Sequence, residues 1–236
     1  DRAAYRLADQ FDQDVLGYLS GYKQSALHSN GDTVNDVVNG DKAIATAGSD
    51  ELLASMKLEA DDFGGSGGSS IGIKPRAGND GATVGSGNAY PLQIIARMAR
   101  KLDQQNVDTQ GRWLVIDPVM KEILMDEDSR LLNSDFGGAG LQNGLILNNL
   151  HGFRVYVSNN LPVIGTGAST TGGTNASNYG VIVGGHDSAI ATAEQINKTE
   201  TYRDPDSFAD IVRGMHLYGR KILRPEALVN AKYNLV

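Results

Sequence analysis

The apolar residues at the start of the chain recur at steps of three and four, which is the spacing of an amphipathic helix. The pattern runs from Asp1 to about Lys23, and its apolar stripe consists of Ala4, Ala8, Phe11, Val15, Tyr18 and Tyr22. At about 1.5 Å per residue this helix would be roughly 35 Å long. We expect it to end at Gly21 or at Asn30-Gly31, because glycine readily terminates helices. A stripe of this length needs an equally long surface to cover it.

Only the extended sequence at the far end of the chain offers such a surface. Two long extended segments, 189–203 and 207–223, flank the turn sequence Asp204-Pro205-Asp206. We therefore predict that the N-terminal helix packs on a C-terminal hairpin within residues 188–236.

The middle of the chain has the pattern of a compact unit of helices and strands. Tyr90-Pro91 opens a second amphipathic helix, since proline is favoured in the first helical turn. The apolar run Trp113–Ile116, between Gly111 and Pro118, predicts a strand buried on both faces, followed by a short helix to about Met125. Further strands are expected at 145–149 and 153–158, as a hairpin or strand pair, and at 179–183. The pattern is α+β, with a middle domain inserted between the long helix and the long hairpin.

Two stretches read as loops. Residues 29–90 are rich in Gly, Ser, Asn and Asp and contain only short helical candidates such as Asp50–Leu58. We expect a long, partly mobile excursion there. A second loop of Gly, Thr, Ser and Asn is expected at 165–178.

Composition excludes several classes of protein. The 236 residues contain no run of about 18 apolar residues, so the sequence predicts a soluble chain without a membrane span. The absence of cysteine excludes disulfides, zinc thiolate sites and thiol catalysis. A formal net charge of −7 argues against a nucleic-acid groove, so any contact with DNA should be weak and non-specific. Asp1 is not a start methionine and no signal pattern follows it, so we expect an N-terminal portion of the protein to be missing from the sequence.

No motif in the sequence supports catalysis. Gly64–Ser70 and Gly165–Thr174 are not followed by Lys-Ser or Lys-Thr, as a phosphate-binding loop requires. Asp62-Phe63-Gly64 and Asp135-Phe136-Gly137 resemble the magnesium triplet of kinases, but no catalytic-loop signature precedes either, and we interpret both as turns. His186-Asp187-Ser188 has the residue types of a hydrolytic triad, but neighbours in an extended segment point to opposite faces.

The remaining candidate ligands are scattered. His28, His151 and His216 lack the close spacing of a metal site. Asp126-Glu127-Asp128 and Asp204-Pro205-Asp206 lack the ligand ladder of a calcium loop. We therefore predict no catalytic, cofactor-binding or metal-ligating residue. Long surface-spanning elements without a site are what a subunit built to contact other subunits would have.

Four segments occur in an order that matches a known family: Lys101–Val107, Gly111–Pro118, Gly152–Pro162 and Tyr218–Leu228. Together with the opening helix they resemble the major capsid protein of tailed double-stranded DNA bacteriophages, which has the Hong Kong 97-type capsid fold. The opening Asp1–Tyr5 and the ending around 223–227 look closest to capsid proteins of short-tailed phages.

The resemblance implies a domain organisation. Residues 1–27 would form the spine helix of a peripheral domain, and 28–90 a Gly-rich insertion or loop. Residues 91–187 would form the axial domain, and 188–236 the peripheral-domain hairpin and the C-terminus. The N-terminal arm and extended loop that family members carry before the spine helix would be missing from this sequence.

The implied function is structural and not enzymatic, and it needs no cofactor or metal. Copies of the chain would assemble in the host cytoplasm as hexamers and pentamers, which close into the icosahedral shell of the virion around the double-stranded DNA genome. The expected partners are other copies of the chain, a scaffold protein, a portal and a cement protein, with only non-specific contact with DNA and no membrane. Two alternatives stay open: a surface-binding or adhesin-like module of a virion, and a hydrolase with an unrecognised site.

Overall fold

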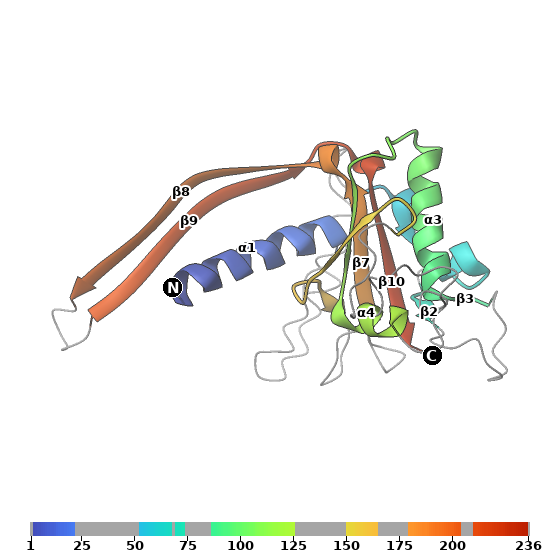
Figure 1. Cartoon of the computed structure of the whole chain (residues 1–236), viewed down its shortest axis with the longest axis horizontal. Coiled ribbons are helices and arrows are strands. Elements are labelled where there is room, and N and C mark those ends of the chain that lie inside the picture. The colour runs from blue at the N-terminus through green and yellow to red at the C-terminus, as the bar shows by residue number, and fades with distance from the viewer. Residues whose placement is uncertain are drawn as a thin grey trace, which may run out of the picture.

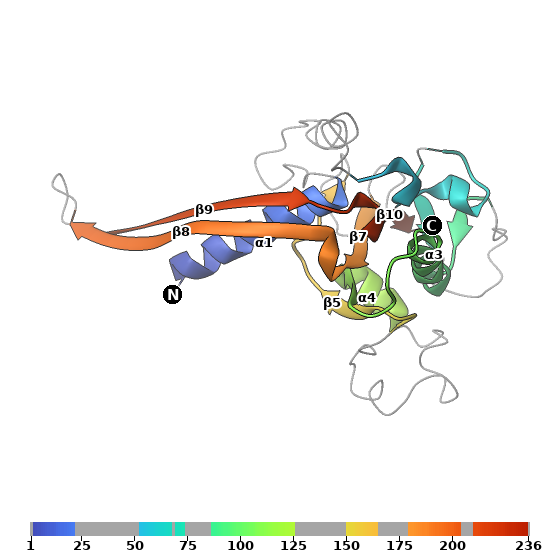
Figure 2. The ribbon, with the colours of Figure 1, turned by 90° about the horizontal axis from the view of Figure 1, so that it is seen from above.

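A computed structural model gives the structure of the chain, and it describes residues 2–21, 52–67, 69–73, 86–125, 150–164, 179–203 and 210–235. Figure 1 shows two parts, a sheet with helices packed on it and a long two-stranded ribbon that extends away from the sheet. We call the first part the sheet body. The second part, β8 (Ile190–Arg203) and β9 (Asp210–Ile222), is the hairpin arm. Helix α1 (Arg2–Ser20) lies alongside the arm in both views (Figures 1 and 2). The fold is therefore mixed α+β, as the sequence predicts.

The sheet body is built on a sheet with the order β3-β2-β10-β7-β4-β5, to which β1 adds on β10 and β6 on β7. Its strands are β1 (Lys57–Leu58), β2 (Ile71–Ile73), β3 (Asn88–Ala89), β4 (Arg112–Ile116), β5 (Arg154–Val157), β6 (Val163–Ile164), β7 (Tyr179–His186) and β10 (Leu228–Leu235). Strand β10 runs antiparallel to β7 and parallel to β1 and β2. The last strand of the chain thus joins segments that come from its two halves.

Two helices pack in the sheet body where the sequence predicts them. Helix α3 (Pro91–Gln104) has proline at its first position, and it buries Ile94, Ile95, Met98 and Leu102. Helix α4 (Pro118–Leu124) starts after Asp117, whose carboxylate accepts a hydrogen bond from the Met120 amide at 3.2 Å. A cap of this kind stabilises a helix by about 0.5–2 kcal/mol.

One continuous core joins the sheet, helices α3 and α4 and the end of α1. Tyr233 of β10 is fully buried, and its ring lies over Gly180 of β7. A Cβ atom at Gly180 would lie 2.8 Å from the Tyr233 ring, which is too close for any other residue type. The close approach of β7 and β10 therefore depends on this glycine.

The end of α1 confirms the predicted stop at Gly21. Gly21 has a φ of +80°, the left-handed conformation that favours glycine and closes helices. The side-chain amide of Asn230 donates to the carbonyl of Ser20, so the end of α1 is tied to the buried strand β10. Within the range 1–27 predicted for the spine helix, the helix itself spans Arg2–Ser20.

The expectation of a loop over residues 28–90 is wrong for its described parts. Met56, Leu58, Ile71 and Ile73 are buried in the core, and β1, β2 and β3 belong to the large sheet. The helical candidate 50–58 is a 3-10 turn, η1 (Ala54–Met56), followed by β1, and a second turn, η2 (Ala60–Phe63), comes next. These strands have only two or three residues each, which is too short to show any periodicity in the sequence.

Two further expectations are corrected, for β4 and for the segment 188–236. Strand β4 is not buried on both faces, because Arg112, Leu114 and Ile116 are buried while the residues between them are half-buried. The predicted strand at 153–158 is β5, which pairs in parallel with β4, and its predicted pairing with 145–149 stays a prediction because 145–149 lie outside the described residues. The segment 188–236 is not a single hairpin, because the ribbon ends at Ile222 and β10 turns back into the sheet.

Candidate assembly surface

The hairpin arm is a ribbon of unusual length. Its strands pair antiparallel from Ile190 opposite Ile222 to Arg203 opposite Asp210, with one irregularity between Glu194 and Ile196. Strand β8 has 14 residues, whereas strands of globular proteins usually have about 5–6. At about 3.3 Å per residue the arm is roughly 45 Å long. Figure 2 shows that it projects well beyond the sheet body.

Helix α1 supports the arm through one cluster of side chains. The rings of Phe11 and Tyr218 meet edge to face, with centroids 4.6 Å apart. The Tyr218 hydroxyl donates to the Asp14 carboxylate at 2.9 Å, and Asp14 also forms an ion pair with Arg220. The Arg220 guanidinium lies 4.8 Å from the centre of the Tyr18 ring. These contacts confirm the predicted packing of the N-terminal helix on the C-terminal hairpin.

Farther from the sheet body the described side chains of the arm are largely exposed. Met215 is 54% and Leu217 48% exposed, and both lie on the same face of β9 because they are two residues apart. Across the ribbon, Arg213 pairs with Glu200 at 2.8 Å in an exposed position. A two-stranded hairpin is marginally stable by itself in water. The arm therefore exposes apolar side chains along a long ribbon surface.

The arm joins the sheet body through two short turns, η5 (Asp187–Ala189) and η6 (Pro225–Ala227). The amides of Leu223 and Arg224 both donate to the carbonyl of Ala189, at 2.8 and 3.2 Å. Arg224 also pairs with Glu226 at 2.9 Å, and this hydrogen bond lowers the pKa of the Glu226 carboxyl below its usual value. The junction is thus fixed by backbone bonds between the two ends of the ribbon.

The sequence His186-Asp187-Ser188 lies in this junction, and its geometry differs from the expectation. The segment turns at η5 and is not extended, so the His186 Nδ1 and Ser188 Oγ atoms lie 2.8 Å apart. The Ser188 amide donates to the same nitrogen at 3.1 Å, which makes His186 the cap of the turn. Asp187 pairs with Arg154 at 2.9 Å, and both side chains are more than half exposed. A histidine and a serine meet here, but the carboxylate is engaged with an arginine of β5.

A buried pair that the sequence did not predict ties β10 to α4. The Tyr233 hydroxyl lies 2.6 Å from both carboxylate oxygens of Asp117, and both residues are almost completely buried. Burial raises the pKa of the Asp117 carboxyl, and burial beside that carboxylate raises the pKa of the Tyr233 hydroxyl. The Asp-Pro start of α4 was visible in the sequence, but the tyrosine is separated from it by 116 residues.

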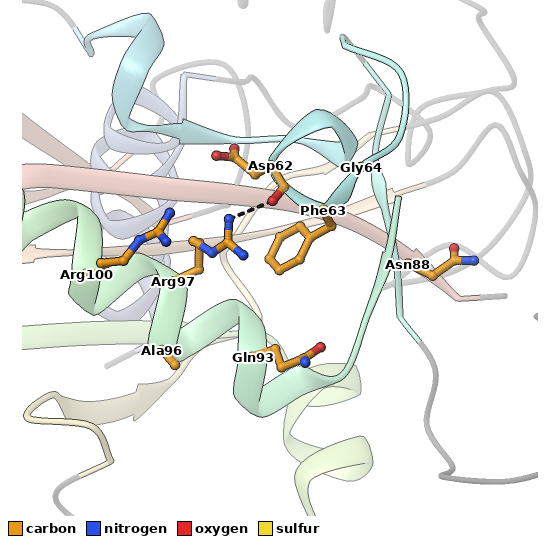
Figure 3. Close-up of a pocket in the computed structure, with 8 residues that line it drawn as sticks. All are labelled: Asp62, Phe63, Gly64, Asn88, Gln93, Ala96, Arg97 and Arg100. Atoms are coloured by element: carbon orange, nitrogen blue, oxygen red, sulfur yellow. Dashed lines mark hydrogen bonds between the residues drawn. The ribbon is translucent and has the colours of Figure 1, made fainter. Parts of the chain in front are cut away.

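A pocket of about 540 Å³ opens between η2 and α3 (Figure 3). It is lined by Asp62, Phe63, Gly64, Asn88, Gln93, Ala96, Arg97 and Arg100. Arg97 donates to the Asp62 carbonyl at 2.6 Å and stacks over the Phe63 ring at 4.8 Å, while the Asp62 carboxylate pairs with Lys101 at 3.0 Å. Gly64 ends η2 with a φ of +80°, which confirms that Asp62-Phe63-Gly64 is a turn.

Several candidate residues lie outside the described part of the chain: His28, Asp126-Glu127-Asp128, Asp135-Phe136-Gly137, Gly165–Thr174 and Asp204-Pro205-Asp206. Within the described residues, no group of three or more His, Asp or Glu side chains is placed to hold a metal ion. The helices in this part of the chain are too short or too polar to cross a membrane.

Comparison with known proteins gives a consistent match. A family model described as phage capsid protein matches residues 1–231. A structure from Mycobacterium phage Che8 is 26% identical with a TM-score of 0.57, and the match covers 97% of this chain and 60% of that one. The present chain is therefore shorter than this relative. No curated protein matches the chain.

Two other solved structures are similar to part of the chain. The capsid of cyanophage P-SCSP1u is 21% identical with a TM-score of 0.47, over 61% of this chain and 46% of that one. The mature capsid of bacteriophage PhiM1 is 20% identical with a TM-score of 0.45, again over 61% of this chain and 46% of that one.

Proposed function

Because the chain belongs to the phage capsid protein family, we propose that it is the major capsid protein of a tailed double-stranded DNA phage. Its copies assemble as hexamers and pentamers into the icosahedral shell of the virion, which encloses the genome. The family consists of structural proteins and not of enzymes, and this favours the shell over the hydrolase and the adhesin-like module. The observation that supports the proposal most directly is a family match over residues 1–231.

The hairpin arm agrees with this function. A ribbon with strands of 14 and 13 residues, supported by one helix near its base and exposed farther out, has more surface than one subunit covers. In a closed shell each copy is surrounded by others, so the arm would find its second support on a neighbour. The net charge of −7 suits a wall that does not retain packaged DNA, so contact with the genome would be non-specific.

We also propose a division into two domains. Helix α1 and the hairpin arm would form the peripheral domain, and the sheet body with α3 and α4 the axial domain. Strand β10 would then connect them, because it continues from the arm into the centre of the sheet. The segment 28–90 would contribute to the axial domain, since β1, β2 and β3 lie in its sheet.

The finer assignments rest on the resemblance of short segments. Asp1–Tyr5 and the sequence around 223–227 favour a short-tailed phage. As partners we propose a scaffold protein that guides assembly, a portal at one vertex and a cement protein on the outer surface. Purification of the native particle, followed by mass spectrometry of its proteins and electron microscopy of its tail, tests each of these assignments.

Assembly of the full-length protein tests the main proposal. We expect it to sediment as particles of megadalton size that appear as closed shells in electron micrographs. Leu217→Asp should abolish these particles while the circular dichroism of the subunit stays unchanged, because Leu217 is exposed in the single subunit. Gln105→Asp, an equal gain of charge at an exposed site of the sheet body, is the control and should assemble. A wild-type protein that stays a single subunit under all assembly conditions would refute the proposal.

A further inference from the structure

The pocket between η2 and α3 differs in charge from the rest of the chain. Arg97 and Arg100 lie one helical turn apart on α3, and Figure 3 shows both side chains on the side of the helix that faces η2. The chain as a whole has 28 acidic and 21 basic residues. Two guanidinium groups thus line one pocket of a chain that is acidic overall, and like charges at this spacing repel each other.

The acidic residue of the pocket does not neutralise these two arginines. The Asp62 carboxylate is held by Lys101 at 3.0 Å and by the Glu59 amide at 3.2 Å. The Arg97 guanidinium donates to the carbonyl of Asp62 and lies over the ring of Phe63. Among the residues that the structure describes, neither arginine has a carboxylate partner. Within the described part of the chain, the pocket thus holds two arginines that no carboxylate pairs with, and contacts with Asp62 and Phe63 hold Arg97 in place.

The pocket walls add further recognition groups. The side chains of Asn88 and Gln93 line it from β3 and from the first turn of α3, and Phe63 and Ala96 give it an apolar part. Arginine binds carboxylates through paired N–H donors, and such bonds are among the strongest between side chains. A volume of about 540 Å³ accommodates one or two side chains of a peptide, and it is too small for a DNA duplex.

We propose that this pocket binds an Asp or Glu side chain from a second copy of the chain, as an ion-paired contact between subunits of the shell. The occupant follows from charge, because a neighbouring copy with 28 acidic and 21 basic residues presents more carboxylates than cations. Arg100 makes the contact, and Arg97, stacked on Phe63, orients the anion. The inference rests on the proposed shell function, since only assembly brings a second copy to the pocket.

A zero-length cross-link tests the contact in assembled particles of the full-length protein. In Arg100→Lys the charge is kept, and a carbodiimide joins the new amine to any carboxylate that touches it, with loss of water and formation of an amide. Particles are assembled from equal amounts of isotopically light and heavy subunits, so that mass spectrometry separates links within a chain from links between chains. Gln104→Lys places an amine one turn further along α3, outside the pocket lining, and is the control.

We expect Arg100→Lys to give an amide link between a light and a heavy chain, at an Asp or Glu, at least severalfold more often than Gln104→Lys does. Links only to acids of the same chain, attachment to nucleic acid, or no link in intact particles would each overturn the pocket contact and leave the shell function standing. A protein that forms no particles would instead refute the shell, and the pocket contact with it.

Charge-matched variants test the energy of the same contact. Arg100→Gln and Gln104→Glu each make the chain more negative by one charge, but only the first removes a pocket arginine. An exposed ion pair changes an equilibrium about 1.5- to 5-fold, so we expect Arg100→Gln to raise the subunit concentration needed for assembly by at least that factor. Gln104→Glu should leave it unchanged. Equal effects of the two variants would refute a specific contact.

Discussion

The sheet body contains a long antiparallel strand pair, β7 with β10, and the hairpin arm consists of another, β8 with β9, yet the surroundings of the two pairs differ. In the pair of β7 with β10, the described residues 180–185 and 228–233 are all buried. In the pair of β8 with β9, the described residues 191–195 and 213–215 are all exposed. The same hydrogen-bond ladder is therefore surrounded by core in one region and by solvent in the other.

This difference indicates where each region obtains its stability. Burial of a large apolar side chain contributes about 1.5–3 kcal/mol, and the sheet body buries many of them in one cluster. The arm has its ladder, a few exposed pairs and the contacts with α1 at its base. We infer that the sheet body is stable within one subunit, whereas the outer part of the arm is stabilised by contacts between subunits.

The same truncation in both regions tests this difference in stability most directly. Leu114→Ala in β4 removes a fully buried side chain and should lower the free energy of unfolding by about 2–5 kcal/mol. Leu217→Ala in β9 removes a side chain that is 48% exposed and should change it by less than about 0.5 kcal/mol. Urea unfolding of the unassembled subunit measures both. Equal losses would show that the arm is packed within the subunit after all.

A second test concerns the polar pair inside the sheet body. Asp117→Ala should cost about 1–3 kcal/mol, because the buried Tyr233 hydroxyl loses its acceptor and α4 loses its cap. Asp117→Asn should cost less, since an amide oxygen still accepts a hydrogen bond at this position. No substitution of an exposed charge in the arm should have an effect of this size.

The pH dependence of the free energy of unfolding tests how the charge of Asp117 contributes to this pair. Burial raises the pKa of Asp117 above its ordinary 3.8, so the folded chain keeps a proton at pH values where the unfolded chain has lost it. The contribution of Asp117 to stability therefore falls as the pH rises from 3.8 to the raised pKa, and it is constant above that. Unfolding curves between about pH 4 and about pH 8 should show the wild type losing stability relative to Asp117→Asn. Parallel profiles would contradict the buried, desolvated carboxylate.

The sequence predicts the arm and its helix better than it predicts the sheet body. Helix α1 has several turns of periodic apolar residues, and the two strands of the arm are long and contiguous, so local pattern suffices. The strands β1 and β3 have two residues each, which is too short for any period. Strand β10 reads as a continuation of the hairpin, and only its pairing with β7 shows that it lies elsewhere.

The side-chain clusters were hidden for a related reason. Arg97 and Asp62 are 35 residues apart, and Asp117 and Tyr233 are 116 apart, so their contacts follow from the sheet order and not from spacing. The meeting of His186 with Ser188 depends on a single 3-10 turn, which the assumption of an extended segment excluded. The composition shows only that the chain is acidic overall. It does not show that helix α3 places two arginines in one pocket.

A small coupling is expected at the boundary between the two regions, where α1 supports the base of the arm. The Tyr218 hydroxyl donates to Asp14, and Asp14 also pairs with Arg220, but the Asp14 and Arg220 side chains are 39% and 28% exposed. Solvent screens such contacts, so a double-mutant cycle of Asp14→Asn and Tyr218→Phe should give a coupling free energy below about 1 kcal/mol in the unassembled subunit. Tyr218→Phe keeps the ring contact with Phe11, so the cycle isolates the hydrogen bond. A coupling above about 2 kcal/mol would show that the base of the arm is stabilised as strongly as the buried networks of the sheet body. The part of the arm that depends on neighbouring subunits would then begin farther along the ribbon.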